Sequence, residues 1–276
     1  MSQSNDPGYG TTNPGNQFNP APKKQGLSGG QIALLILGLL SGIGLFICGG
    51  IALMVWRVAT GVREAAGYMQ DDSNLAQIGL ALHNYESVHK RFPAPTIDDA
   101  AGRPALSGVI SLLPYLEENS TYDRIDLKNV KAWDSPSNIA LQGPAPSVLR
   151  SFRANDPPES DVTHVFWISS PYKTGGPNTV FSNGRYSQFS DCTDGTSNTL
   201  IAIALVSHSQ PWAKPSTLTP DEAFALIQKE RKYKYVFGLL MDGGTIQIPL
   251  SIKRSTFDAL VSRDGGESVD PESLED

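Results

Sequence analysis

A stretch of 25 residues, Ile32 to Trp56, contains no charged side chain. At about 1.5 Å of rise per helical residue, a helix of this length exceeds the hydrocarbon core of a bilayer, which is about 30 Å thick. The stretch therefore predicts a single transmembrane helix in contact with lipid. The alternative, a buried helix of a soluble core, fits less well because soluble helices seldom remain apolar on every face over this length.

The rest of the chain divides around this span. Residues 1–31 are rich in Gly, Asn, Gln and Pro, which predicts a disordered tail. Residues 57–92 predict an amphipathic helix that joins the span to a β-rich domain over residues 93–266, and residues 267–276 predict an acidic disordered tail. A domain of this size can bury a core of its own.

The joining helix is indicated by side chains that recur every three or four residues. They are Leu75, Ile78, Leu82, Tyr85 and His89. This spacing places them on one helical face, which we expect to pack on the domain. Pro93 and Pro95 end the pattern.

Charge argues against a nucleic-acid partner. The formal net charge is −6, and Ser262 to Asp276 carry −5 of it, so the remainder is nearly neutral rather than basic. Lys23 and Lys24 precede the span, and Arg57 and Arg63 follow it. Two basic residues on each side leave the orientation undecided by the positive-inside rule.

Within the span, Gly38 and Gly42 are separated by one helical turn. Such a pair lets two membrane helices approach closely, so it is compatible with self-association in the bilayer. The alternative is that these glycines reflect the general frequency of glycine in membrane helices.

The domain contains three turn signals between strand-like runs. They are Asn183-Gly184, Asp194-Gly195 and Asp242-Gly243. Each predicts a type I′ hairpin, and together they predict a mainly antiparallel sheet. Two short helices are also expected, one opened by a capping box from Thr219 to Glu222 and one over Ser255 to Ser262.

Several motifs occur in one order along the chain. They are Asn74 to Tyr85 with His83, Asn84 and Tyr85, Arg91 to Pro93 with Phe92 and Pro93, Leu112 to Glu117, Trp133 to Pro136, Asp194-Gly195 to Thr199, Pro211 to Pro215, and Asp242-Gly243. In these motifs the chain resembles the bacterial domain-of-unknown-function family numbered 1559. The resemblance implies an α+β, pilin-like architecture, in which an N-terminal membrane helix continues into a helix packed on the sheet.

The resemblance also implies a location. It places the protein in the bacterial cytoplasmic (inner) membrane, single-pass, with the C-terminal domain facing the periplasm or the cell exterior. Two departures from the family pattern are present. No prepilin-like leader occurs around Gly30 to Leu34, so we expect the span to remain as an anchor, and Lys232 stands where many members carry a histidine.

Little in the sequence indicates chemistry. Asp191, Asp194 and Asn198 are close enough to gather oxygen ligands for calcium, but an Asp-Gly turn capped by its own side chains is the preferred interpretation. No catalytic constellation and no cofactor motif is recognisable, so an enzyme is not expected. Three tryptophans would line a binding groove or fill the core: Trp133, Trp167 and Trp212.

Three classes of function are compatible with these patterns. The first is a membrane-anchored structural or interaction protein of the cell envelope, with envelope proteins as partners. The second is an anchored module that binds a ligand such as a glycan. The third is an enzyme.

Overall fold

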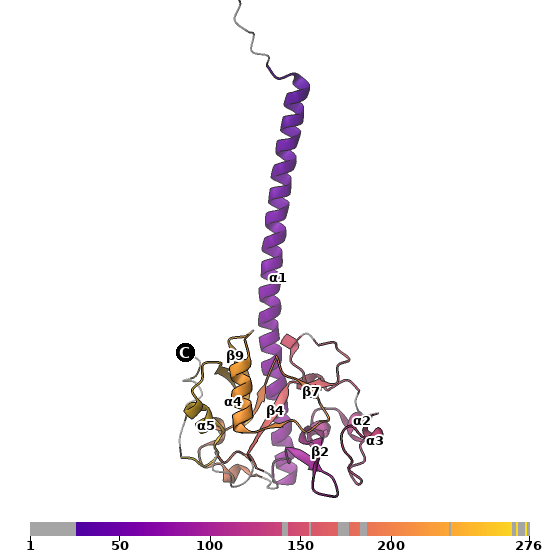
Figure 1. The fold of residues 1–276 in the computed structure, drawn as a ribbon, viewed down its shortest axis with the longest axis vertical. Coiled ribbons are helices and arrows are strands. Elements are labelled where there is room, and N and C mark those ends of the chain that lie inside the picture. Colours follow the sequence, from indigo (N-terminus) through magenta and orange to yellow (C-terminus); the bar gives the residue numbers. More distant parts are fainter. Residues whose placement is uncertain are drawn as a thin grey trace, which may run out of the picture. The chain divides into compact units, whose positions relative to one another are not determined.

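The computed structural model describes six stretches of the chain and two single residues (Figure 1): 26–139, 143–154, 156–170, 177–182, 187–231, 233–266, Val269 and Leu274. The described residues fall into two compact units, Met1–Val58 and Ala59–Asp276. Most of the two predicted tails, 1–31 and 267–276, lies outside the described residues, as does Lys232.

The first unit contains the beginning of a 61-residue helix, α1 (Gly29–His89). At its amino end, the backbone N–H of Ser28 donates a 3.0 Å hydrogen bond to the side-chain oxygen of Gln31. Every residue from Ile32 to Trp56 is helical and exposed. Among the described residues, α1 is the helix long and apolar enough to cross a membrane.

The second unit begins with the remainder of α1, which packs on the domain through its apolar stripe. Three members of the stripe are fully buried: Leu75, Ile78 and Leu82. Tyr85 is half-buried and His89 is exposed. The helix ends at His89 rather than at residue 92, because Lys90 adopts a positive φ of 58°, a conformation that no right-handed helix continues through.

The strands of the second unit are short. In the described part of the chain they are β1 (Thr96–Asp98), β2 (Pro104–Ser107), β3 (Val162–Thr163), β4 (Val165–Ser170), β5 (Phe181–Ser182), β6 (Leu200–Ala204), β7 (Gln210–Pro211), β8 (Thr217–Leu218), β9 (Tyr235–Leu240) and β10 (Thr245–Pro249). The main sheet has the order β10-β9-β6-β4-β5, and β8 also pairs with β4. Two smaller sheets pair β1 with β2 and β3 with β7.

β4 pairs with three other strands of the main sheet, and all its residues are buried. β4 pairs with β6, β6 with β9 and β9 with β10 in antiparallel fashion, which confirms the predicted mainly antiparallel sheet. β5 and β8 instead run parallel to β4. These two strands contain two residues each, too few to produce an alternating pattern in the sequence.

Short helices surround the sheet. They are α2 (Asn119–Tyr122), α3 (Pro136–Ile139), α4 (Pro220–Lys229), α5 (Arg254–Val261), and the 3-10 helices η1 (Gly108–Tyr115), η2 (Ser147–Leu149), η3 (Phe152–Ala154), η4 (Phe189–Asp191) and η5 (Thr196–Asn198). The predicted capping box opens α4: the backbone N–H of Thr219 donates to the Glu222 carboxylate at 2.8 Å, and the N–H of Glu222 donates to the Thr219 hydroxyl at 3.3 Å. α5 begins and ends one residue earlier than expected.

The two faces of the sheet belong to two apolar clusters. Trp167 of β4 packs in one cluster with Leu75 of α1. Phe166, its neighbour in β4, packs in the other with Ile227 of α4 and Phe257 of α5. The sheet therefore lies between α1 on one face and α4 with α5 on the other, which is the expected α+β, pilin-like layout (Figure 1).

The turn at Asp242-Gly243 joins β9 to β10 as predicted, but its type differs. The N–H of Gly243 donates to the carbonyl of Leu240, and the N–H of Leu240 donates to the carbonyl of Gly244. Gly243 has a positive φ of 87°, whereas Asp242 does not have a positive φ. This pattern is a three-residue loop with a glycine bulge rather than a type I′ turn.

The hairpin predicted at Asp194-Gly195 is wrong. Gly195 has the expected positive φ, 96°, but it lies between η4 and η5, and β6 begins only at Leu200. An Asp-Gly pair indicates the backbone conformation of the turn alone, whereas a hairpin also requires a strand on each side of the turn. The third predicted turn, Asn183-Gly184, lies outside the described residues.

Candidate functional site

His83 and the Asp242-Gly243 motif meet where α1 crosses the β9–β10 turn. A Cβ added at Gly243 would lie 3.2 Å from Cδ2 of His83. The ring of His83 lies 5.0 Å from that of Phe189, and its Nε2 is buried without a hydrogen-bond partner in the described structure. These motif residues hold the helix against the turn.

The other motif residues of this region also pack rather than line a cleft. Tyr85 stacks on His89 at 4.1 Å between ring centroids and meets Tyr115 edge-on at 5.9 Å. Phe92 and Pro93 are buried, whereas Asn84 is exposed. The motif therefore fixes the end of α1 to the domain.

The three calcium candidates have their side chains engaged with the protein. The Asp194 carboxylate accepts hydrogen bonds from the backbone N–H groups of Gly265 and Gly266 at 2.8 and 2.9 Å. Asp191 accepts from the N–H of Gln188 at 2.9 Å, and the Asn198 amide donates to the carbonyl of Asp194 at 3.3 Å. Within the described residues, no group of three or more His, Cys, Asp and Glu side chains is arranged to hold a metal.

The tryptophans do not form a common groove. Trp167 and Trp212 are buried, and Nε1 of Trp212 donates to the carbonyl of Gly143 at 3.3 Å. Trp133 is half-buried, with Nζ of Lys214 5.8 Å from its ring centroid.

A buried ion pair, which sequence reasoning missed, ties α1 to the segment after η2. Nε of Arg153 donates to the Asp71 carboxylate at 2.6 Å, and both side chains are nearly inaccessible. The Asp71 carboxylate also accepts from the Ser151 hydroxyl at 2.7 Å and from the N–H of Phe152 at 2.7 Å. The Arg153 guanidinium lies 4.4 Å from the Tyr68 ring centroid, which adds a cation–π contact.

A signal for this pair is present in the sequence. Asp71 lies four residues before Leu75, on the apolar stripe of α1, where a solvent-exposed aspartate is not expected. Its partner lies 82 residues away, so no local pattern identifies Arg153.

His164 lies beside this ion pair. Its Nδ1 accepts a 3.2 Å hydrogen bond from the N–H of Ser151, so the proton of the neutral ring is on Nε2, 3.1 Å from Oδ2 of Asp156. Oδ2 of Asp156 is buried and accepts no hydrogen bond within the described structure. Burial lowers the pKa of His164 below its ordinary value of 6.5, and the nearby carboxylates of Asp156, Asp71 and Glu230 oppose that shift.

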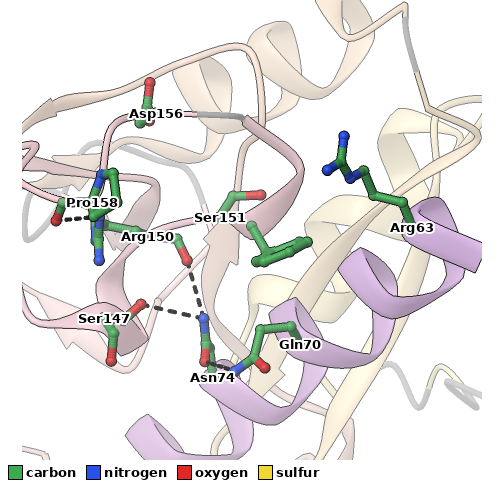
Figure 2. Close-up of a pocket in the computed structure, with 9 residues that line it drawn as sticks. Arg63, Gln70, Asn74, Ser147, Arg150, Ser151, Asp156 and Pro158 are labelled. Atoms are coloured by element: carbon green, nitrogen blue, oxygen red, sulfur yellow. Dashed lines mark hydrogen bonds between the residues drawn. The ribbon is translucent and has the colours of Figure 1, made fainter. Parts of the chain in front are cut away.

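An open pocket of about 460 Å³ adjoins these residues. One wall is α1 and the other consists of residues from 147–154 and 156–158 (Figure 2). We call it the two-arginine pocket, and its lining consists of Arg63, Gln70, Asn74, Ser147, Arg150, Ser151, Phe152, Asp156 and Pro158. The Asn74 amide donates to the carbonyls of Ser147 and Arg150 at 3.3 and 3.1 Å, which holds the two walls together.

Comparison with protein families places most of the second unit in a known family model. Residues 60–226 fit the model of a family described as "Protein of unknown function (DUF1559)". The match covers more than half of the chain and includes the motifs from Asn74 to Pro215, whereas Asp242-Gly243 lies beyond it. No curated protein and no solved structure matches.

Proposed function

The chain belongs to the DUF1559 family of proteins of unknown function, and on that premise we propose that it is a membrane-anchored protein with a non-catalytic structural or interaction role in the bacterial cell envelope. Its domain is expected to face the periplasm or the cell exterior. The observation that carries this proposal is the exposed apolar helix from Ile32 to Trp56. Exposure to water is unfavourable for a helix that is apolar on all faces, and burial in the lipid bilayer removes this cost.

Two experiments test the anchoring and its orientation. The intact chain is expected to stay in the membrane pellet after carbonate extraction, and protease added to osmotically opened cells is expected to digest the domain. A matched variant, Leu40→Lys with Ile43→Lys, places two charges in the span. Each charge costs about 2.5–3.5 kcal/mol at the centre of the bilayer, so this variant is expected to leave the membrane pellet on carbonate extraction. Extraction of the unmodified chain would contradict anchoring, and protection of the domain would contradict the orientation.

An assembly role would require contact between copies of the chain, and we propose that the span supplies it through Gly38 and Gly42. A Cβ added at Gly38 or at Gly42 would meet nothing within 4 Å, so both positions are open to a second helix. Gly42→Ile is expected to reduce cross-linking between copies, whereas Gly44→Ile, which lies about 160° around the helix from Gly42, serves as the matched control. Equal cross-linking in both variants would argue against this contact.

The second candidate, an anchored ligand-binding module, is favoured by the two-arginine pocket. Binding of the detergent-solubilised full chain to a glycan array tests the glycan version of this candidate. Saturable binding that is lost on substitution of Phe152 would favour this candidate over a purely structural role.

A further inference from the structure

The two-arginine pocket carries an excess of positive charge. Arg63 and Arg150 line it, and the one acid among the nine lining residues is Asp156. Oδ2 of Asp156 is buried 3.1 Å from Nε2 of His164, so this oxygen faces the imidazole instead of the solvent in the pocket. The pocket is therefore suited to an anionic group.

The two guanidinium groups differ in how they are held. Nη1 of Arg150 donates to the carbonyls of Pro157 and Pro158 at 3.1 and 2.7 Å, which fixes the group in place and leaves Nη2 without a partner among the described residues. Arg63 lies on α1 on the opposite side of the pocket and points toward it (Figure 2). Guanidinium groups match the geometry of phosphate and carboxylate oxygens.

The pocket also has an apolar part. Phe152 is 53% exposed, and among the described residues that follow α1 it is the exposed large apolar side chain. Its backbone is fixed, because its N–H donates to the buried carboxylate of Asp71. An exposed aromatic ring held beside two cations favours a ligand that has both an anionic and an apolar portion.

We propose that the two-arginine pocket binds the phosphate of an anionic phospholipid, with Arg63 and Arg150 contacting the phosphate oxygens and Phe152 contacting the apolar part of the lipid. A lipid is preferred over a soluble phosphate ester because Arg63 follows the last residue of the charge-free span, Trp56, by seven positions in the sequence. This inference rests on the proposed anchoring and adds a specific lipid partner to it.

The test uses the detergent-solubilised full chain titrated with phosphatidylglycerol or phosphatidylcholine, with bound lipid measured by native mass spectrometry. Phosphatidylglycerol is expected to bind more tightly than phosphatidylcholine. Arg63→Gln is expected to weaken phosphatidylglycerol binding by about fivefold or more, in line with the contribution of one cation to lipid attraction. Arg63 makes no hydrogen bond or ion pair with the described residues, so this change should leave folding intact.

Arg57→Gln is the matched control, because it removes the same charge beside the span but does not line the pocket. Equal losses in the two variants would mean general electrostatic attraction and would overturn the pocket assignment. The melting temperature of the chain can also be measured with sn-glycerol 3-phosphate and with phosphatidylglycerol. A larger rise with sn-glycerol 3-phosphate would assign the pocket to a soluble phosphate ester and overturn the proposal of a lipid ligand. Failure of anchoring is distinguishable, since the chain would then be extracted by carbonate whichever lipid it binds.

Discussion

A Cβ added at Gly79 would lie 2.7 Å from Cα of Gly243, so helix α1 and the β9–β10 turn touch backbone to backbone. No flexible side chain stands between them to give way. Gly79→Ala is therefore expected to force the helix and the turn apart and to lower the free energy of unfolding by about 1–3 kcal/mol. Thermal and urea unfolding of the detergent-solubilised chain measure this loss.

Gly61→Ala provides the comparison on the same helix, because nothing lies within 4 Å of the added Cβ. The better helix propensity of alanine should stabilise the chain there by about 0.5–1 kcal/mol. Similar effects of the two substitutions would show that the close approach at Gly79 is not important.

Removal of one member of the buried ion pair should be costly. Asp71→Leu leaves the Arg153 guanidinium buried without its carboxylate, and Arg153→Met leaves the carboxylate buried without its guanidinium; each is expected to cost about 3–5 kcal/mol. In the double variant Asp71→Leu with Arg153→Met no uncompensated charge remains, so its loss should be smaller than the sum of the two single losses. Additive losses in this double-mutant cycle would refute the explanation.

Stability should rise with pH through the range in which His164 titrates. Because burial lowers its pKa below 6.5, the unfolded chain binds the proton more readily than the folded chain. The contribution is fully present above pH 6.5 and is lost as the pH falls through the lowered folded value. Unfolding midpoints measured across this range should lose part of their slope in His164→Gln, and an unchanged slope would count against the assignment.

Calcium should have little effect on stability. The carboxylates of Asp194 and Asp191 already accept hydrogen bonds from backbone N–H groups, so a calcium ion would have to replace these hydrogen bonds. An ion bound at a hundred times its dissociation constant would add about 2.7 kcal/mol. A melting temperature that rises by several degrees with millimolar calcium, and no longer does so in Asp194→Ala, would establish a calcium site.

The elements predicted well from sequence are those that depend on neighbouring residues. The charge-free run at Ile32 to Trp56 and the capping box at Thr219 both specify a helix through contacts within a few positions. The two Asp-Gly pairs show that neighbouring residues alone do not determine whether a turn forms a hairpin. Asp242-Gly243 has a strand on each side and forms a hairpin, whereas Asp194-Gly195 has the same residues, a glycine that also has a positive φ, and no hairpin.

The candidate site depends on distant contacts and could not be predicted from the sequence. Arg150 and Phe152 reach α1 across more than 70 residues of sequence, and their neighbours in the chain contain no motif that indicates a pocket. Only the polar interruption of the apolar stripe at Asp71 is visible, and it indicates a partner without identifying it.

The strand order of the main sheet affects how the domain folds during synthesis. β9 and β10 follow the other strands of the main sheet in the chain, yet β9 lies beside β6 and packs in the same cluster as Leu75 of α1. During synthesis the apolar stripe of α1 therefore emerges long before the strands that cover it. Contacts this distant in sequence form slowly, so we expect the apolar stripe of α1 to stay incompletely covered until β9, which ends at Leu240, has been added.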